Sequence, residues 1–408
     1  MRSLAAEARA ARHLAVLDES TVEFNFSGVA GASFSAIAKR LGLTRAGIYN
    51  YCSDRQDLVF QCYQRACALA EDDLLRACDT PARGAERLGV FLKLSVDLGH
   101  APVSVLSELA FLNRRQQTVI REARAKNVQL LENILLQGQQ DGSIRRCDLD
   151  VVCQAIFGVL SWAPLSRIWT RHDDAEFAAR MAAAIPDMIL NGVAASNAPL
   201  PETHRRIADG LIDVQRTERE QRLESLARIG SMLFNRRGID GVSLDDVALE
   251  MGATKGVLYH YFKSKSEFVA FCYTRAFGIY ERIMAVAESC CSTGLEATMA
   301  AIELDVEAQL ADIYPLWLST GIRGLPAKMQ VQLLKRNQLL AARSVALARR
   351  GLADGSLRRF DLEPVKLAAP GSFTYLSTWL PQADQRRAGE IAREISRFLL
   401  LGLRSRLD

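Results

Sequence analysis

The sequence predicts an all-α protein made of two similar halves. Apolar residues recur at i, i+3 and i+4 along most of the chain, without the alternation of strands, and glycine and proline fall mainly at the breaks. Residues 31–66 align without a gap on residues 241–276, always 210 positions later, and 12 of the 36 aligned positions are identical. A chain of 408 residues is also too long for one core. We therefore expect two all-α units.

The duplication extends over about two hundred residues. DGSIRRCDL at 141–149 matches DGSLRRFDL at 354–362, now 213 positions later, and near the end of each copy the offset returns to 210. The stretch ASNAPLPETHRR at 195–206 holds two prolines and no apolar periodicity, which is typical of a linker.

Composition limits the classes of function. The chain is 49% hydrophobic and 24% charged, as folded proteins are, and its net charge of +4 is too small to indicate nucleic acid by itself. No apolar run reaches membrane-spanning length and the first residues do not resemble a signal peptide, so we expect a cytoplasmic protein without a membrane partner. Nine cysteines without a CxxC pair indicate buried thiols instead of disulfides or a zinc site.

The second copy contains a helix-turn-helix pattern. Ser243 can cap a short helix with apolar residues at 244, 247, 248 and 251. Gly252 supplies the left-handed residue of a tight turn, and a second short helix is expected over 255–261. Leu258 would anchor that helix while small and polar residues face outward, as a helix in a major groove requires.

The first copy repeats this plan. Ser33 caps the first short helix, Gly42 makes the turn, and the second helix is expected over 45–51. Two capped helices with a glycine turn are often only a helical hairpin, but the glycine, hydroxyl and tyrosine positions recur together in both copies.

The stretch from Ser231, SMLFNRRGIDGVSLDDVALEMGATKGVLYHYFKSKSEFV, resembles the DNA-binding region of the TetR family of bacterial transcriptional regulators, and the resemblance covers residues 230–269. SFSAIAKRLGLTRAGIYNYCSDRQDLV in the first copy is similar to the same region. The DGS-(Ile/Leu)-RR segments resemble the turn before that family's dimerisation helices. The resemblance implies tandem TetR-like units, each with a three-helix DNA-binding head and an all-α effector-binding and dimerisation body.

On this basis the chain divides into five parts. They are head 1 at 1–52, body 1 at 53–197, a linker at 198–204, head 2 at 205–262 and body 2 at 263–408.

The resemblance also implies which residues contact DNA. Arg45 and Lys255 would reach base edges, beside the small or apolar pairs Ala46/Gly256 and Gly47/Val257. The expected base or phosphate contacts are Tyr49, Asn50, Tyr51, Tyr259, His260 and Tyr261, and the expected phosphate contacts are Ser33, Thr44, Arg55, Ser243, Thr254 and Lys265. Cys52 stands where the family favours phenylalanine, and Asp54 would face phosphate unfavourably, so head 1 could have lost DNA binding.

The middle of each body is expected to enclose an effector, although a plain helical core explains most of its apolar residues. The expected lining residues are Phe91, Leu94, Leu98 and Phe111 in body 1 and Ile313, Tyr314, Trp317 and Ile322 in body 2. They favour a small apolar or aromatic effector.

The leading hypothesis is a ligand-responsive repressor that binds a double-stranded DNA operator. Apolar stripes in the last helices of both copies predict an intramolecular pseudo-dimer, alone or paired into a further homodimer. The alternative is a ligand- or protein-binding regulator in which head 1 has lost DNA binding. Five scattered histidines and no GxSxG or glycine-rich phosphate loop give no indication of an enzyme, a catalytic residue, a metal or a cofactor.

Overall fold

The structure, a computed structural model, describes residues 2–170, 174–196, 217–310, 313–317, 325–374, 376–379 and 385–405. Within these ranges the chain is helical, with two isolated β-bridges and no strand, so the all-α prediction is confirmed. No helix of the described ranges is long and apolar enough to span a bilayer. The predicted linker at 198–204 lies outside the described residues.

In the first half, the described residues form eight α-helices and a 3₁₀ turn. They are α1 (Arg2–Gly31), α2 (Phe34–Arg40), α3 (Arg45–Ile48), α4 (Arg55–Asp79), α5 (Gly84–Ser95), η1 (Leu109–Phe111), α6 (Arg114–Gln140), α7 (Leu149–Thr170) and α8 (Ala175–Asn191).

The second half repeats this order at the sequence offsets of 210 and 213. Its described helices are α9 (Glu218–Arg237), α10 (Leu244–Glu250), α11 (Lys255–Tyr261), α12 (Lys265–Cys290), α13 (Gly294–Leu310), α14 (Ala327–Ala353), α15 (Leu362–Ala368), α16 (Gly371–Thr374), α17 (Leu376–Trp379) and α18 (Gln385–Leu401). The single helix α7 thus corresponds to the shorter pieces α15, α16 and α17.

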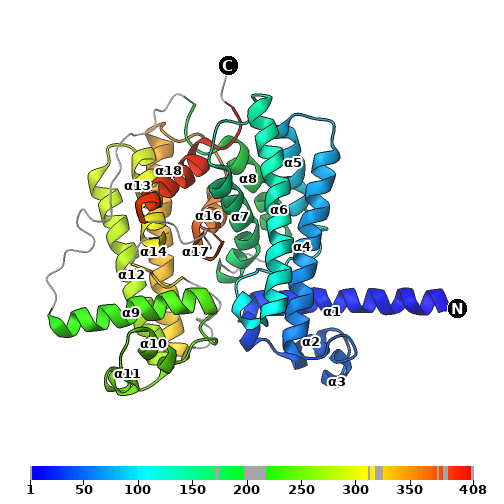
Figure 1. Ribbon diagram of the computed structural model, residues 1–408. Helices are drawn as coiled ribbons and strands as arrows, with labels where there is room; N and C mark the ends of the chain where they lie inside the picture. Colours follow the sequence, from blue (N-terminus) through cyan, green and yellow to red (C-terminus); the bar gives the residue numbers. More distant parts are fainter. Residues whose placement is uncertain are drawn as a thin grey trace.

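Figure 1 shows the two heads side by side at the same end of the molecule. Helices α1 and α9 lie across this end, with α2 and α3 below one and α10 and α11 below the other. The long helices α4 and α6 rise from head 1, α12 and α14 rise from head 2, and the last helices of both halves fill the space between them (Figure 1).

Each head has its own apolar core, whereas the bodies share one. Val247, Leu258 and Phe268 are buried in head 2, and the corresponding Ile37, Ile48 and Leu58 are buried in head 1. The shared core takes its buried residues from α4 to α8 of the first half and from α13 to α18 of the second. Burial of apolar surface therefore holds the two halves together within one chain.

Two arginines join the halves in the same way on either side of this core. Arg145 Nε donates to the carbonyl of Gly402 at 2.7 Å, and its Nη2 pairs with Glu394 at 3.1 Å. Arg358, 213 positions later, donates from Nε to the carbonyl of Gly192 at 2.7 Å and pairs with Asp187 at 2.6 Å. Each arginine follows the DGS turn of its own half and binds the end of the last helix of the other half.

Candidate nucleic-acid interface and cavity

Head 2 carries a complete helix-turn-helix unit. Ser243 Oγ accepts the Asp246 amide at 3.1 Å, and Asp246 in turn accepts the Ser243 amide at 2.7 Å, which closes a capping box at the start of α10. Gly252 has φ +66°, so the expected left-handed turn is confirmed. Recognition helix α11 then begins at Lys255 and is anchored by the buried Leu258.

The outer surface of α11 presents the residues expected at DNA. Tyr259 and His260 are exposed, Val257 and Tyr261 are half-buried, and a side-chain carbon on Gly256 would meet nothing within 4 Å. Thr254 precedes the helix without a side-chain cap, which leaves its hydroxyl available. The side chain of Lys255 lies outside the described part of the chain.

Head 1 has the same plan with a shorter recognition helix. Gly42 has φ +63°, and Thr44 caps α3 by accepting the Gly47 amide at 3.0 Å. The predicted helix over 45–51 is wrong at its end, because α3 stops at Ile48. The amides of residues 49, 50 and 51 bond three residues back, which gives a tighter turn than an α-helix.

Most predicted contact residues of head 1 lie on one exposed surface. Arg45, Ala46, Tyr49 and Asn50 are exposed. Tyr51 stacks on His13, with ring centroids 5.9 Å apart. Ser33, like Ser243, is a helix N-cap, and its Oγ accepts a hydrogen bond from the Ala36 amide at 3.2 Å.

The two predicted phosphate contacts after the recognition helices differ. Arg55 donates to the Val29 carbonyl at 2.6 Å and lies 5.2 Å from the Phe34 ring, so its guanidinium joins α4 to α1. Lys265 begins α12, and partial burial lowers its pKa against the opposing effect of Asp240 and Asp246. The two positions therefore have different surroundings, and a DNA contact by Lys265 stays a prediction.

Body 1 encloses a cavity of about 740 Å³. It lies between α1, α4, α5, α6, α7 and α8 and the segment 96–106, and Trp379 of α17 lines it from the second half. Phe91 and Phe157 supply part of an apolar wall, their ring centroids 6.1 Å apart. A space of this size accommodates a small organic molecule.

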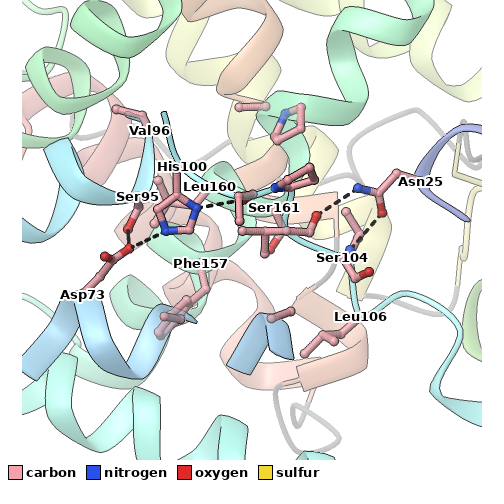
Figure 2. Close-up of a pocket in the computed structure, with 18 of the residues that line it drawn as sticks. Asn25, Asp73, Ser95, Val96, His100, Ser104, Leu106, Phe157, Leu160 and Ser161 are labelled. Carbon is pink, nitrogen blue, oxygen red and sulfur yellow. Dashed lines mark hydrogen bonds and ion pairs between the residues drawn. The ribbon is translucent and has the colours of Figure 1, made fainter. Parts of the chain in front are cut away.

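A polar cluster occupies one end of the cavity (Figure 2). His100 Nε2 lies 3.1 Å from Asp73 Oδ2, and Nδ1 lies 2.8 Å from the Ala101 carbonyl. Ser95 Oγ donates to the same Asp73 oxygen at 3.5 Å. The hydrogen bond from Asp73 raises the pKa of His100 above its usual range.

Asn25 helps to tie the cavity wall to head 1, beside a hydrogen bond from Ser104 to Thr21 of α1 at 3.0 Å. Asn25 of α1 donates to the Val103 carbonyl at 2.9 Å and accepts the Val105 amide at 3.1 Å, as Figure 2 shows. Asn235 of α9, 210 positions later, makes the same pair of bonds to the Pro315 carbonyl and the Trp317 amide, at 2.9 and 3.1 Å. Each head is thus clamped to the segment that follows the first helix pair of its own body.

The predicted pocket residues separate into two groups. Phe91 and Leu98 line the cavity, whereas Leu94 is not among the lining residues and Phe111 packs against the core of head 1 instead. In body 2, Ile313 packs against a small buried cluster, and Trp317 is buried with its indole nitrogen donating to Gln309. Tyr314 has φ +43°, and Ile322 lies outside the described residues.

Larger side chains explain why the interior of body 2 is packed differently. Cys67 and Ala70 line the cavity of body 1, and the corresponding residues of body 2 are Phe277 and the inward-facing Tyr280. Tyr280 accepts a hydrogen bond from Gln309 at 3.0 Å, so this tyrosine and Trp317 meet at one amide.

The sequence analysis missed Asn25, Asp73, His100, Arg124 and Asn127. A signal for two of them was present. Arg124 and Asn127 fall between Ile120 and Leu131 at intervals of four, three and four residues, which places them on the apolar stripe of α6. A charged and an amide residue at such positions indicate a polar site inside a helical body.

The described residues contain no group of three or more His, Cys, Asp or Glu side chains placed to hold a metal ion. Burial raises the pKa of several cysteine thiols, for example those of Cys67 and Cys147 to about 11.

Two family profiles match this chain. Residues 230–270 match bacterial regulatory proteins of the tetR family, and residues 85–193 match the tetracyclin repressor-like C-terminal domain. The Transposon Tn10 TetC protein of Escherichia coli is 23% identical over 161 residues, which are 38% of this chain and 77% of TetC.

Solved structures are also similar to parts of the chain. PfmR of Thermus thermophilus is 23% identical, with a TM-score of 0.37, and the match covers 43% of this chain and 97% of PfmR. AibR, solved with isovaleryl coenzyme A and operator DNA, is 26% identical with a TM-score of 0.36, over 43% of this chain and 97% of AibR. Two separate parts of the chain, the head of the second half and the body of the first, therefore match profiles of the tetR family of bacterial regulatory proteins.

Proposed function

We propose that this protein is a ligand-responsive repressor whose single chain presents two different recognition helices to one asymmetric DNA operator. The observation that carries the proposal is the position of the heads. They lie side by side at one end of the molecule, and a core shared by both bodies joins them (Figure 1). An ordinary homodimer of such units presents two identical helices and binds a palindrome.

The two recognition surfaces would read different bases. Head 1 offers Arg45, Tyr49 and Asn50, whereas head 2 offers Lys255, Tyr259 and His260 at the same positions. Arginine can bind guanine through two parallel hydrogen bonds, while lysine acts as a point charge. Unlike half-sites are therefore expected.

The effector would act through the wall of the cavity in body 1. Segment 96–106 lines the cavity and is bonded to α1 through Asn25, so a ligand that shifts this segment also shifts head 1. Glu108, just beyond the segment, accepts the Val29 amide of head 1 at 3.0 Å and lies against Gly238 of head 2. Coupling between effector and DNA of about 1 to 3 kcal/mol is usual for such systems, and it must be reciprocal.

Two observations favour the alternative in which head 1 no longer binds DNA. Its recognition helix is a single turn, and Arg55 is bonded within the protein. Both hypotheses have the same fold and the same cavity, and they differ in whether Arg45 contributes to DNA binding.

The experiment selects duplexes from a random pool with the purified full chain and footprints the best sequence with the wild type, Arg45→Ala and Lys255→Ala. We expect two protected segments of unlike sequence. Each substitution should relax base preference in one of them by about 1 to 3 kcal/mol for each base that the side chain reads. Loss of specificity only in Lys255→Ala would support the alternative, and no sequence preference in the wild type would contradict both. Transcription from a promoter that overlaps the selected sequence should fall when the protein is added.

A further inference from the structure

The cavity of body 1 contains a buried positive charge without an acidic partner. Arg124 is 9% exposed and lines the cavity from α6. Its guanidinium carbon lies 4.3 Å from the ring centroid of Phe157 and 4.6 Å from that of Trp379. Its hydrogen bond goes to the Gln154 amide oxygen at 2.8 Å, and no carboxylate of the described residues lies within ion-pair distance. Burial lowers the pKa of Arg124 to about 10, which still leaves the group charged.

The other buried charges of the cavity cancel each other. Both nitrogens of His100 face acceptors, Asp73 and the Ala101 carbonyl, and only the imidazolium form can donate to both. His100 and Asp73 therefore form a neutral ion pair. Asp97 also lines the cavity but is exposed to solvent. The buried lining keeps one net positive charge, that of Arg124.

A free acceptor lies one turn from this charge. Asn127 is 2% exposed, and its Nδ2 donates to the Cys67 carbonyl at 2.8 Å, which fixes the orientation of the amide. Its Oδ1 is buried, and no described residue lies within hydrogen-bond distance of it in a suitable geometry. A buried acceptor left unpaired is destabilising, so a donor from a bound molecule would be stabilising here.

We propose that this cavity binds an organic monoanion with an apolar or aromatic body, such as an aromatic or long-chain acid. Arg124, whose guanidinium lies against the rings of Phe157 and Trp379, would bind the anionic group, and a hydroxyl or amide of the same molecule would donate to Asn127. The inference rests on the proposed effector role of the cavity and names its ligand class. Because Trp379 belongs to the second half, the ligand would contact both halves of the chain.

The second body lacks this site, so one ligand is expected for each chain. Arg124 corresponds to Asn337, and Ala70 corresponds to Tyr280, whose ring takes up space inside body 2.

The test measures binding of two dyes to the full chain by fluorescence titration. 8-Anilinonaphthalene-1-sulfonate carries an anion, and N-phenyl-1-naphthylamine has the same aromatic body without it. We expect the wild type to bind one anionic dye per chain. Arg124→Met should weaken binding of the anionic dye by about tenfold or more and leave binding of the neutral dye within about twofold, because a hydrogen bond to a charged group is lost.

Two further variants serve as controls. Arg336→Met removes a guanidinium that lies 5.2 Å from the Phe277 ring but is paired with Glu281 at 2.8 Å, and it should leave the binding of both dyes unchanged. Ala70→Tyr places in body 1 the residue that body 2 already carries, and it should abolish the binding of both dyes by filling the cavity.

A competition series tests the same idea without any substitution. 1-Naphthoic acid should displace the neutral dye at a concentration about tenfold or more below that needed for 1-naphthamide. Equal displacement by the two compounds, or equal loss of both dyes in a folded Arg124→Met, would overturn the inference.

DNA-binding measurements distinguish failure of the monoanion site from failure of the proposed function. In the absence of ligand, Arg124→Met should bind the selected duplex as the wild type does. A wild type that binds the anionic dye but shows no DNA preference would contradict the proposed function and leave the monoanion site standing.

Discussion

The two halves pack very closely where α7 crosses α16. Gly158 and Gly371 occupy equivalent positions, 213 residues apart, and meet directly. A Cβ atom on Gly158 would lie 2.2 Å from the carbonyl oxygen of Gly371. Ordinary carbon–oxygen contacts are about 3.4 Å, so Gly158→Ala requires the two helices to separate by about 1 Å inside a closely packed core.

The expected cost follows from two opposing effects. Overpacking a core costs about 1 to 3 kcal/mol, and here the obstacle is a backbone atom that no side-chain rotation can move. Alanine in place of glycine within a helix contributes up to about 1 kcal/mol in the other direction. We expect Gly158→Ala to lower the free energy of unfolding by about 1 to 2 kcal/mol after this offset.

Gly278→Ala is the matched control. Gly278 also lies within a helix, α12, but a Cβ atom there would meet only the end of Arg282, at 3.9 Å. This variant should gain up to about 1 kcal/mol from helix propensity alone. Urea denaturation followed by circular dichroism and by tryptophan fluorescence would measure both variants. If Gly158→Ala proved as stable as Gly278→Ala, the close crossing of the two halves would be wrong.

Three further predictions concern the halves, the second body and the DNA surface. Arg145→Ala and Arg358→Ala should each lower the free energy of unfolding by about 1.5 to 3 kcal/mol and by similar amounts, because each removes a charged hydrogen bond to the opposite half. Thermal denaturation that showed no loss of stability in either variant would contradict this prediction. Burial raises the pKa of Asp305 from 3.8 to about 7, so the folded state retains a proton that the unfolded state releases, and the free energy of unfolding should fall as pH rises from about 4 to 7. Asp305→Asn should remove up to roughly 4 kcal/mol of this pH dependence, measured by denaturation curves across that range. An unchanged pH dependence in Asp305→Asn would count against this prediction. Lys265→Ala should weaken binding to all DNA sequences alike and reduce the salt slope of the binding constant by about 1, and a change of sequence preference instead would show that Lys265 reads bases.

The helix-turn-helix units could be predicted because their signals are local. A hydroxyl cap at Ser243 and a glycine that needs positive φ at Gly252 depend on a few neighbouring residues, and both appear in the structure as expected. The end of α3 was mispredicted because it depends on packing. In head 2, Phe262 bonds back to Leu258 and its ring packs on Phe268 at a centroid distance of 4.9 Å, whereas Cys52 provides no ring.

The location of the cavity could not be predicted from the apolar pattern alone. Helical spacing shows which residues face inward but not how much space their volumes leave. Ala70 and Tyr280 are both compatible with a buried helix face, yet one borders a cavity and the other points into a packed interior. Predicting the polar site at Arg124 and Asn127 would also have required knowing that α6 borders the cavity.

The number of chains on one operator decides whether a single chain supplies both half-sites. Sedimentation of the purified protein with the selected duplex, at concentrations well above the dissociation constant, gives this number directly. We expect one chain per duplex with two unlike half-sites protected. Two chains on a palindromic duplex, each using the same head, would contradict the two-headed arrangement.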